Sequence, residues 1–169
     1  PDEEGFFRNP NELAFIDLNQ PPGPGNPVLK TIRSFGSAPT GIVLDKDGCI
    51  YVADTDNHSI QKFDKDGKFL ARWGGEPSGQ EGQFYYPRGL AIGSNGEVYV
   101  SDSGNNRIQR FDAEGNVMHA WGKFGFAWRG ADMGKFDVPW GVATDRDGNL
   151  YVTDTSNSRV QKFKADGTP

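Results

Sequence analysis

The sequence predicts an all-β fold made of repeated four-stranded antiparallel sheets, the blades of a partial β-propeller. The main observation is a motif that occurs at 51–63, 99–111 and 151–163, as YVADTDNHSIQKF, YVSDSGNNRIQRF and YVTDTSNSRVQKF. Its period of about 50 residues is typical of a repeat architecture. The composition, with 23 Gly, 11 Pro and 12% aromatic residues, favours short strands joined by tight turns over helices.

Residues 1–27 form an irregular N-terminal segment that differs from the repeats. The stretch 21–27 reads PPGPGNP and predicts a loop, because Pro lacks a backbone donor and Gly weakens strands. Residues 13–18 (LAFIDL) are expected to form a strand of a preceding unit. The strand 28–35 (VLKTIRSF) is similar to the ends of the later repeats, FLARWG and VMHAWG. It is therefore expected to be the outer strand of a preceding blade.

Each repeat opens with a Pro-x-Gly triplet that leads into an apolar strand, as at 41–44, 89–92 and 141–143. Asp-Gly or Asn-Gly turns follow, and these pairs supply the positive φ that a tight hairpin requires. Two further strands, a second Gly turn and a fourth strand ending in Trp-Gly complete the unit. The strand 50–53 has apolar residues at every position and therefore on both faces, so neighbouring sheets are expected to cover both faces.

Two complete blades are thus expected at 39–74 and 87–122, and an incomplete blade at 139–167 that stops before its fourth strand. The recurring motif, with its Tyr-Val-x-Asp start and its closing Trp-Gly, resembles the signature of NHL repeats. The resemblance covers residues 28–169 and implies a six-bladed ring. About three blades are present, so the chain is expected to be part of a larger ring. Alternatively, two copies form one ring, and the strand 28–35 of each completes the partner's third blade.

One aspartate recurs in every copy of the motif, and an arginine follows it in two of them. The recurring aspartates are expected to be structural, to hydrogen-bond turn amides or to pair with Arg107 and Arg159. The first copy carries Ser59 at the arginine position, so it lacks the Asp–Arg pairing that the family resemblance implies. The aspartates are Asp54, Asp102 and Asp154.

Composition restricts the possible partners and compartments. A net charge of −5 argues against a nucleic-acid partner, and the single cysteine excludes an intrachain disulfide and a four-Cys zinc site. No apolar run approaches the roughly 20 residues of a membrane-spanning helix. The chain starts at Pro1 without a signal-like segment, as expected of a processed or excised piece. The missing initiator Met and the family resemblance favour an extracytoplasmic or secreted location, while the compartment itself stays open.

Candidate binding residues fall at two places. One follows the blade-opening prolines, where the resemblance places Thr40, Arg88 and Trp140 at the mouth of the ring's channel. The other is the longer connection 123–138, where Trp128 and its neighbours have no counterpart in the connection 75–86. Aromatic and Arg residues are enriched in protein-binding surfaces. The candidates in this connection are Phe126, Trp128 and Arg129.

An enzymatic function finds little support in the residues. Peptidyl-hydroxyglycine amidating lyases resemble NHL propellers and place zinc-binding His after the blade-opening prolines. This chain has no His there, and its two histidines, His58 and His119, lie elsewhere. The Asp-x-Asp-Gly sequences are interpreted as hairpin turns, because the longer calcium-loop pattern is absent. No catalytic residue, metal ligand or cofactor is assigned.

The preferred function is a non-catalytic binding or scaffold module for a protein or peptide partner. A metal-dependent lyase or hydrolase with its site at the channel mouth is the first alternative. An RNA-binding NHL domain is the second, because some NHL domains bind RNA through a basic top face. Its contributors would be Arg88, Arg107, Lys123, Arg129 and Lys135.

Overall fold

The computed structural model describes residues 13–16, 28–32, 38–122, 132–164 and 167–168. The predicted contacts Phe126, Trp128 and Arg129 lie outside this part of the chain, as does Lys123. None of the described residues belongs to a helix that is both long and apolar enough to cross a membrane.

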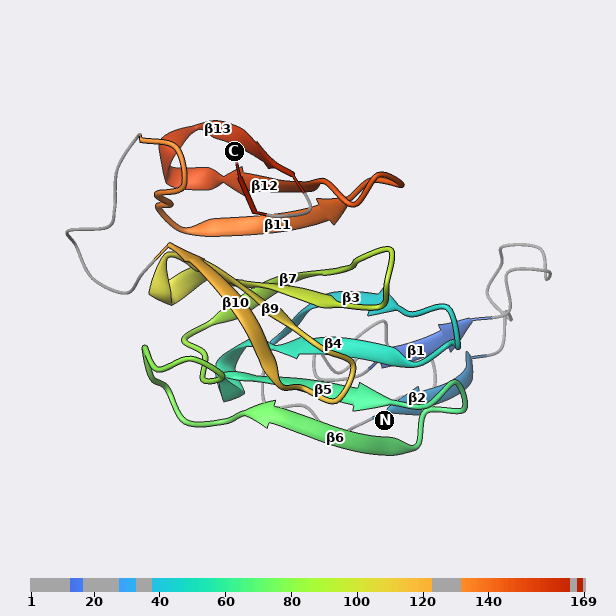
Figure 1. Cartoon of the computed structure of the whole chain (residues 1–169). Helices are drawn as coiled ribbons and strands as arrows, with labels where there is room; N and C mark the ends of the chain where they lie inside the picture. Colours follow the sequence, from blue (N-terminus) through green and yellow to red (C-terminus); the bar gives the residue numbers. More distant parts are fainter. Residues whose placement is uncertain (1–12, 17–27, 33–37, 123–131, 165–166, 169) are drawn as a thin grey trace.

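The repeats form three antiparallel sheets, named blades one to three, which succeed one another along a stack (Figure 1). Blade one contains β3 (Pro39–Leu44), β4 (Ile50–Asp54), β5 (Ser59–Phe63) and β6 (Phe69–Gly74). Blade two contains β7 (Pro87–Ile92), β8 (Val98–Asp102), β9 (Arg107–Phe111) and β10 (Val117–Gly122). Blade three contains β11 (Pro139–Thr144), β12 (Leu150–Asp154) and β13 (Arg159–Phe163). The all-β, partial-propeller prediction is confirmed for the described residues.

The remaining two strands, β1 (Leu13–Ile16) and β2 (Val28–Ile32), pair with each other in an antiparallel two-stranded sheet. Each blade also has a short 3₁₀ turn between its second and third strands. The sequence motif did not reveal these turns, although each falls on the three residues after the recurring aspartate. They are η1 (Thr55–Asn57), η2 (Ser103–Asn105) and η4 (Thr155–Asn157).

The inner strands begin earlier than the apolar pattern predicts, at the proline itself. Pro39 pairs with Asp54, and the register then shifts before Ile42 pairs with Val52. Proline is tolerated at the first residue of a strand or at a bulge, where its missing N–H leaves no gap in the ladder. The same irregularity recurs at Pro87 and Pro139.

Two apolar clusters join the three blades. One cluster lies between blades one and two, and it includes Tyr51, Ile60, Trp73, Leu90 and Phe111. The other lies between blades two and three, and it includes Tyr99, Ile108, Phe136, Val152 and Phe163. The strands of blade two are thus covered on both faces, as the apolar residues at both parities predict.

Because the strands alternate in direction, every blade has two distinct ends. The inner strands start at one end, where the 3₁₀ turns and the connections between blades also lie; we call it the top face. The Asp-Gly and Asn-Gly turns lie at the opposite, bottom face. In blade one, for example, the first hairpin turn closes with a hydrogen bond from Gly48 N to Asp45 O of 3.1 Å.

Candidate binding surface

Thr40, Arg88 and Trp140 lie on successive inner strands at the top face and contact one another in sequence. The guanidinium carbon of Arg88 lies 3.9 Å from the centroid of the Trp140 ring. The Thr40 hydroxyl donates to the Arg88 carbonyl oxygen at 3.2 Å. Trp140 remains 44% exposed, so its indole offers an accessible aromatic surface with a cation held against it.

The glycine of each Pro-x-Gly triplet is what allows these strands to lie so close together. A Cβ on Gly41 would lie 2.1 Å from the Arg88 carbonyl oxygen, and one on Gly89 would lie 2.2 Å from that of Trp140. Both distances are well below van der Waals contact, so only glycine fits. The glycines of these triplets therefore fix the spacing between Thr40, Arg88 and Trp140.

A second aromatic group lies beside this column, where the connection 75–86 meets the turn of blade one. The Tyr86 backbone N–H donates to His58 Nδ1 at 3.1 Å, and the Tyr86 ring packs edge-on against the imidazole at 4.7 Å. Tyr85 lies 5.3 Å from the same imidazole. His58 is half-buried, and these contacts link blade one to the connection that leads into blade two. In blade two, Asn106 Oδ1 accepts the equivalent hydrogen bond from the Val138 backbone N–H at 2.9 Å.

Sequence reasoning missed the two tyrosines, which are 38% and 37% exposed at the top face. The only signal was their position directly before Pro87, where blade three has Asp137 and Val138. This difference indicates a surface feature only once the turn that the tyrosines pack against, the one that carries His58, is known.

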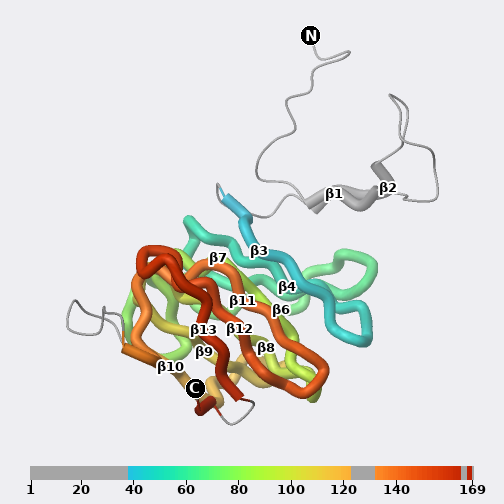
Figure 2. Tube along the Cα trace, turned by 90° about the horizontal axis from the view of Figure 1, so that it is seen from above, coloured from blue at the N-terminus to red at the C-terminus, as the bar shows by residue number. Residues whose placement is uncertain are grey.

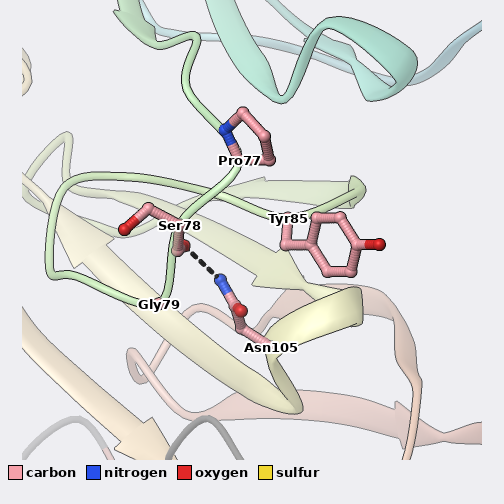
Figure 3. Close-up of a pocket in the computed structure, with 5 residues that line it drawn as sticks. All are labelled: Pro77, Ser78, Gly79, Tyr85 and Asn105. Atoms are coloured by element: carbon pink, nitrogen blue, oxygen red, sulfur yellow. Dashed lines mark hydrogen bonds between the residues drawn. The ribbon is translucent and has the colours of Figure 1, made fainter.

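A pocket of about 420 Å³ opens next to Tyr85 (Figure 3). At this pocket, Asn105 Nδ2 donates to the Ser78 carbonyl oxygen at 2.8 Å. Asn105 Oδ1 is buried without a hydrogen-bond partner. Glu76 and Glu81, in the same connection, are exposed. The pocket thus combines an aromatic ring and oxygen acceptors with nearby negative charge. Its lining residues are Pro77, Ser78, Gly79, Tyr85 and Asn105.

Beneath the top face, the recurring aspartate of blade two organises a buried network. Asp102 accepts from the Tyr85 N–H at 2.7 Å, and from the Arg107 Nε at 2.7 Å. It also accepts from Asn105 Nδ2 at 2.8 Å and Gln109 Nε2 at 3.1 Å. Both Asp102 and Arg107 are almost fully buried. The carboxylate thereby holds the 3₁₀ turn, the third strand and the incoming connection together.

Arg107 also fastens the connection between blades. Its guanidinium donates to the carbonyl oxygens of Gly79 and Gln80 at 2.7 Å each, and to that of Gln83 at 2.9 Å. All three carbonyls belong to the segment that lines the pocket and carries the tyrosines. The arginine therefore positions the top-face loop as well as neutralising Asp102.

Blade three repeats this arrangement and blade one does not. Arg159 Nε donates to Asp154 at 2.8 Å, and its guanidinium reaches the Asp132 and Lys135 carbonyl oxygens. In blade one, Ser59 stands at the arginine position, and its buried hydroxyl has no hydrogen-bond partner. Asp54 there accepts from Asn57 and Gln61 instead.

The buried Asp102 predicts a pH-dependent stability. Burial raises the pKa of this carboxyl from 3.8 to about 6, and the Arg107 charge offsets the rise only in part. Because the folded-state pKa exceeds the unfolded value, the stability contribution is fully present below about pH 4 and is lost as pH rises through about 6. The difference corresponds to about 3 kcal/mol in the free energy of unfolding.

Urea unfolding between pH 4 and 7 tests this expectation, with Asp102→Asn as the variant that cannot titrate. The stability of the wild-type chain relative to the variant should fall as pH rises from 4 to 7. Parallel pH profiles for the two proteins would contradict the raised pKa.

The acidic turns of the bottom face use their carboxylates on their own backbone. Asp45 Oδ1 accepts from the N–H groups of Asp47 and Cys49, and Asp145 accepts from those of Asp147 and Asn149. Such bonds from a side-chain oxygen to nearby backbone N–H groups stabilise the hairpin turns. Among the residues that the structure describes, no group of three or more His, Cys, Asp or Glu is arranged to hold a metal ion.

Comparison with known proteins identifies the repeats. The model of the NHL repeat matches residues 37–63, 84–111 and 136–163. The E3 ubiquitin-protein ligase TRIM71 of Xenopus tropicalis is 51% identical over 43 residues, which are 25% of this chain and 5% of that protein. The chain therefore matches only a small part of this relative.

Solved propellers share the fold. Nidogen, in a nidogen/laminin complex structure, has a TM-score of 0.59 and 25% identity, over 78% of this chain and 46% of that chain. Streptogramin B lyase has a TM-score of 0.57 and 20% identity, over 75% of this chain and 37% of that chain. The second likeness concerns the fold alone. With three matched repeats, two four-stranded blades and a three-stranded one, the chain contains NHL repeats and has the fold of part of a β-propeller.

Proposed function

We propose that this chain is a binding module for a protein or peptide partner, and that its top face makes the contact. The observation that carries the proposal is the exposed Trp140 with the Arg88 guanidinium stacked 3.9 Å from its ring. Trp and Arg dominate the binding energy of protein interfaces when they are held rigidly. Here the Pro-x-Gly triplets hold both residues on adjacent strands. We assign the role to the propeller part, residues 28–169.

The surroundings of this pair favour a polypeptide over a nucleic acid. Tyr85 and Tyr86 extend the aromatic surface, and the pocket next to them offers carbonyl and amide oxygens. Glu76 and Glu81 are exposed in the same connection, and they would repel a phosphate backbone. Arg107, one of the residues of the RNA alternative, is only 4% exposed and is engaged with Asp102. The solved nidogen/laminin complex supports the proposal by analogy, because a propeller neighbour there is crystallised with a protein partner.

The test is selection of a random peptide library displayed on phage against the immobilised chain. Enriched peptides should bind the wild-type chain and lose at least about tenfold in affinity to Trp140→Ala, because truncation of a hot-spot residue costs about 2 kcal/mol or more. Arg88→Ala should weaken binding in the same direction. Met118→Ala is the matched control, since Met118 is 49% exposed and lies near the start of the outer strand β10, at its bottom-face end.

A mixed-sequence single-stranded RNA of about 20 nucleotides serves as the competing probe. The proposal predicts no salt-sensitive retention of this RNA at physiological ionic strength. Tight RNA binding that Arg88→Ala abolishes, together with a failure to enrich any peptide, would contradict the proposal and favour the RNA alternative.

A further inference from the structure

The pocket beside Tyr85 has an aromatic wall that the other blades do not repeat. The Tyr85 ring packs on Gly104, since a Cβ on that glycine would lie 2.5 Å from Tyr85 Cδ1. At the position of Gly104, blade one has Asp56 and blade three has Ser156, and Asp137 takes the place of Tyr85 before blade three. The repeat therefore folds without this wall, and Tyr85 is not explained by the architecture.

The pocket lies at the top face, where the connection 75–86 meets η2 (Figure 3). Four of its lining residues belong to this connection, and the fifth, Asn105, belongs to η2. Seen from above, the connection lies at the end of the stack opposite the hairpin turn between β3 and β4 (Figure 2). Arg88 follows Tyr85 by three residues, so the pocket and the Arg88–Trp140 pair share one face.

A buried acceptor at this pocket has no donor among the described residues. Asn105 is fully buried, and its Nδ2 donates to the Ser78 carbonyl oxygen and to Asp102, each at 2.8 Å. Both donors of the amide are thus used, while Oδ1 has no hydrogen-bond partner. A buried acceptor without a donor is costly, so a ligand that brings an N–H group gains more here than at an exposed oxygen.

The charge and the aromatic wall favour a cation over a neutral donor. Glu76 directly precedes the lining segment 77–79, Glu81 follows it after one residue, and both glutamates are exposed. The exposed Tyr85 ring offers a π face, which attracts an ammonium or guanidinium group. An acidic rim, an aromatic wall and a buried acceptor together suit the side chain of lysine or arginine.

The cations beside the connection do not cancel this acidity. The connection 75–86 itself contains two glutamates and no Lys or Arg. Arg107, which donates to its carbonyl oxygens, pairs with Asp102 at 2.7 Å. Arg72, whose guanidinium lies beside Gly75, donates to the Asn57 carbonyl oxygen at 3.2 Å. The segment that forms the pocket thus keeps an excess of negative charge.

We propose that this pocket receives a lysine or arginine side chain of the partner polypeptide. The inference rests on the proposed binding of a polypeptide at the top face, and it names the chemistry of one residue of that partner. The cationic group contacts the Tyr85 ring and donates to Asn105 Oδ1, while the two glutamates attract it electrostatically. Its aliphatic stem lies along the apolar part of the wall, at Pro77.

An NMR titration of the isotopically labelled chain with N-acetylarginine amide tests the pocket without any selected peptide. N-acetylcitrulline amide is the matched ligand, because it has nearly the same shape and no charge. The arginine derivative should shift the signals of the Asn105 side-chain amide and of the Ser78 and Tyr85 backbone amides. It should also bind at least about tenfold more tightly than the citrulline derivative. Equal binding of the two, or shifts confined to other parts of the chain, would overturn the proposal.

Substitutions at the wall and the rim locate the binding. Tyr85→Leu removes the π face and should weaken the arginine derivative at least about threefold. Glu76→Gln combined with Glu81→Gln should weaken it about threefold at low salt, and this difference should shrink as salt rises. Glu114→Gln makes the same exchange at an exposed position of a bottom-face turn, and it should leave the affinity unchanged. Wild-type affinity in both pocket variants would be incompatible with the proposal.

The library-selected peptides separate this inference from the proposed function. Peptides that lose affinity to Trp140→Ala should share a lysine or arginine, and citrulline or norleucine in its place should weaken them at least about tenfold. Peptides that depend on Trp140 but tolerate the loss of every basic residue would overturn the inference and leave the proposed function intact. Failure to enrich any peptide would contradict the proposed function, and the NMR titration would still decide whether the pocket binds a cation.

Discussion

Gly89→Ala is expected to destabilise the chain by about 3 kcal/mol or more, at the upper end of overpacking effects. The added Cβ would lie 2.2 Å from the Trp140 carbonyl oxygen and 3.0 Å from Ser101 Oγ. The nearer atom is backbone of the next blade, so it moves only if the two inner strands separate. Gly41→Ala should have a similar effect, because its Cβ would lie 2.1 Å from the Arg88 carbonyl oxygen.

Gly141→Ala is the matched control for these two variants. It makes the same substitution in the same triplet, but its nearest neighbour is Thr153 Oγ1 at 3.3 Å. We expect its free energy of unfolding, measured by urea unfolding, to stay within about 1 kcal/mol of the wild-type value. Equal destabilisation by all three substitutions would contradict the close packing of the inner strands.

The second large effect is expected for Arg107→Ser, which gives blade two the residue that blade one has at Ser59. The substitution leaves Asp102 buried without its cation, and it removes the donors to the Gly79, Gln80 and Gln83 carbonyl oxygens. Breaking a buried ion pair on one side typically costs about 3–5 kcal/mol. The midpoint of urea unfolding should fall accordingly, without a change in slope.

Arg159→Ser provides the comparison, because Arg159 makes the same pair with Asp154 at 2.8 Å but is 23% exposed. Water can therefore replace part of its contacts, and the expected loss is smaller than at Arg107. Hydrogen exchange should also show that Arg107→Ser releases the amides of residues 78–85, since the guanidinium holds that segment. An unchanged exchange rate in this segment would mean that the arginine stabilises only its own blade.

The fold was predictable because its determinants are local and repeated. Turn residues such as Asp47-Gly48 fix the hairpins, and strands such as Ile50–Asp54 are apolar at both parities, which predicts sheets covered on both sides. The three copies of the motif then supply the blade count. The early start at Pro39 was missed, because the pairing across a bulge depends on register rather than on residue type.

The candidate site was predictable in part. The column of Thr40, Arg88 and Trp140 follows from the repeat, but the stacking of Arg88 on Trp140 depends on how closely two inner strands approach. The contact of Tyr86 with His58 joins a connection to a turn of the preceding blade, and no periodic pattern encodes it. The partner depends on the chemistry of these loops, which the repeat does not determine.

Hydrogen exchange with a library-selected peptide is the most direct test of polypeptide binding at the top face. The peptide should slow exchange at 85–89 and 139–141, around Arg88 and Trp140, and leave the bottom turns at 45–48 and 145–148 unchanged. Slowed exchange at the bottom turns, with none around Arg88 and Trp140, would contradict it.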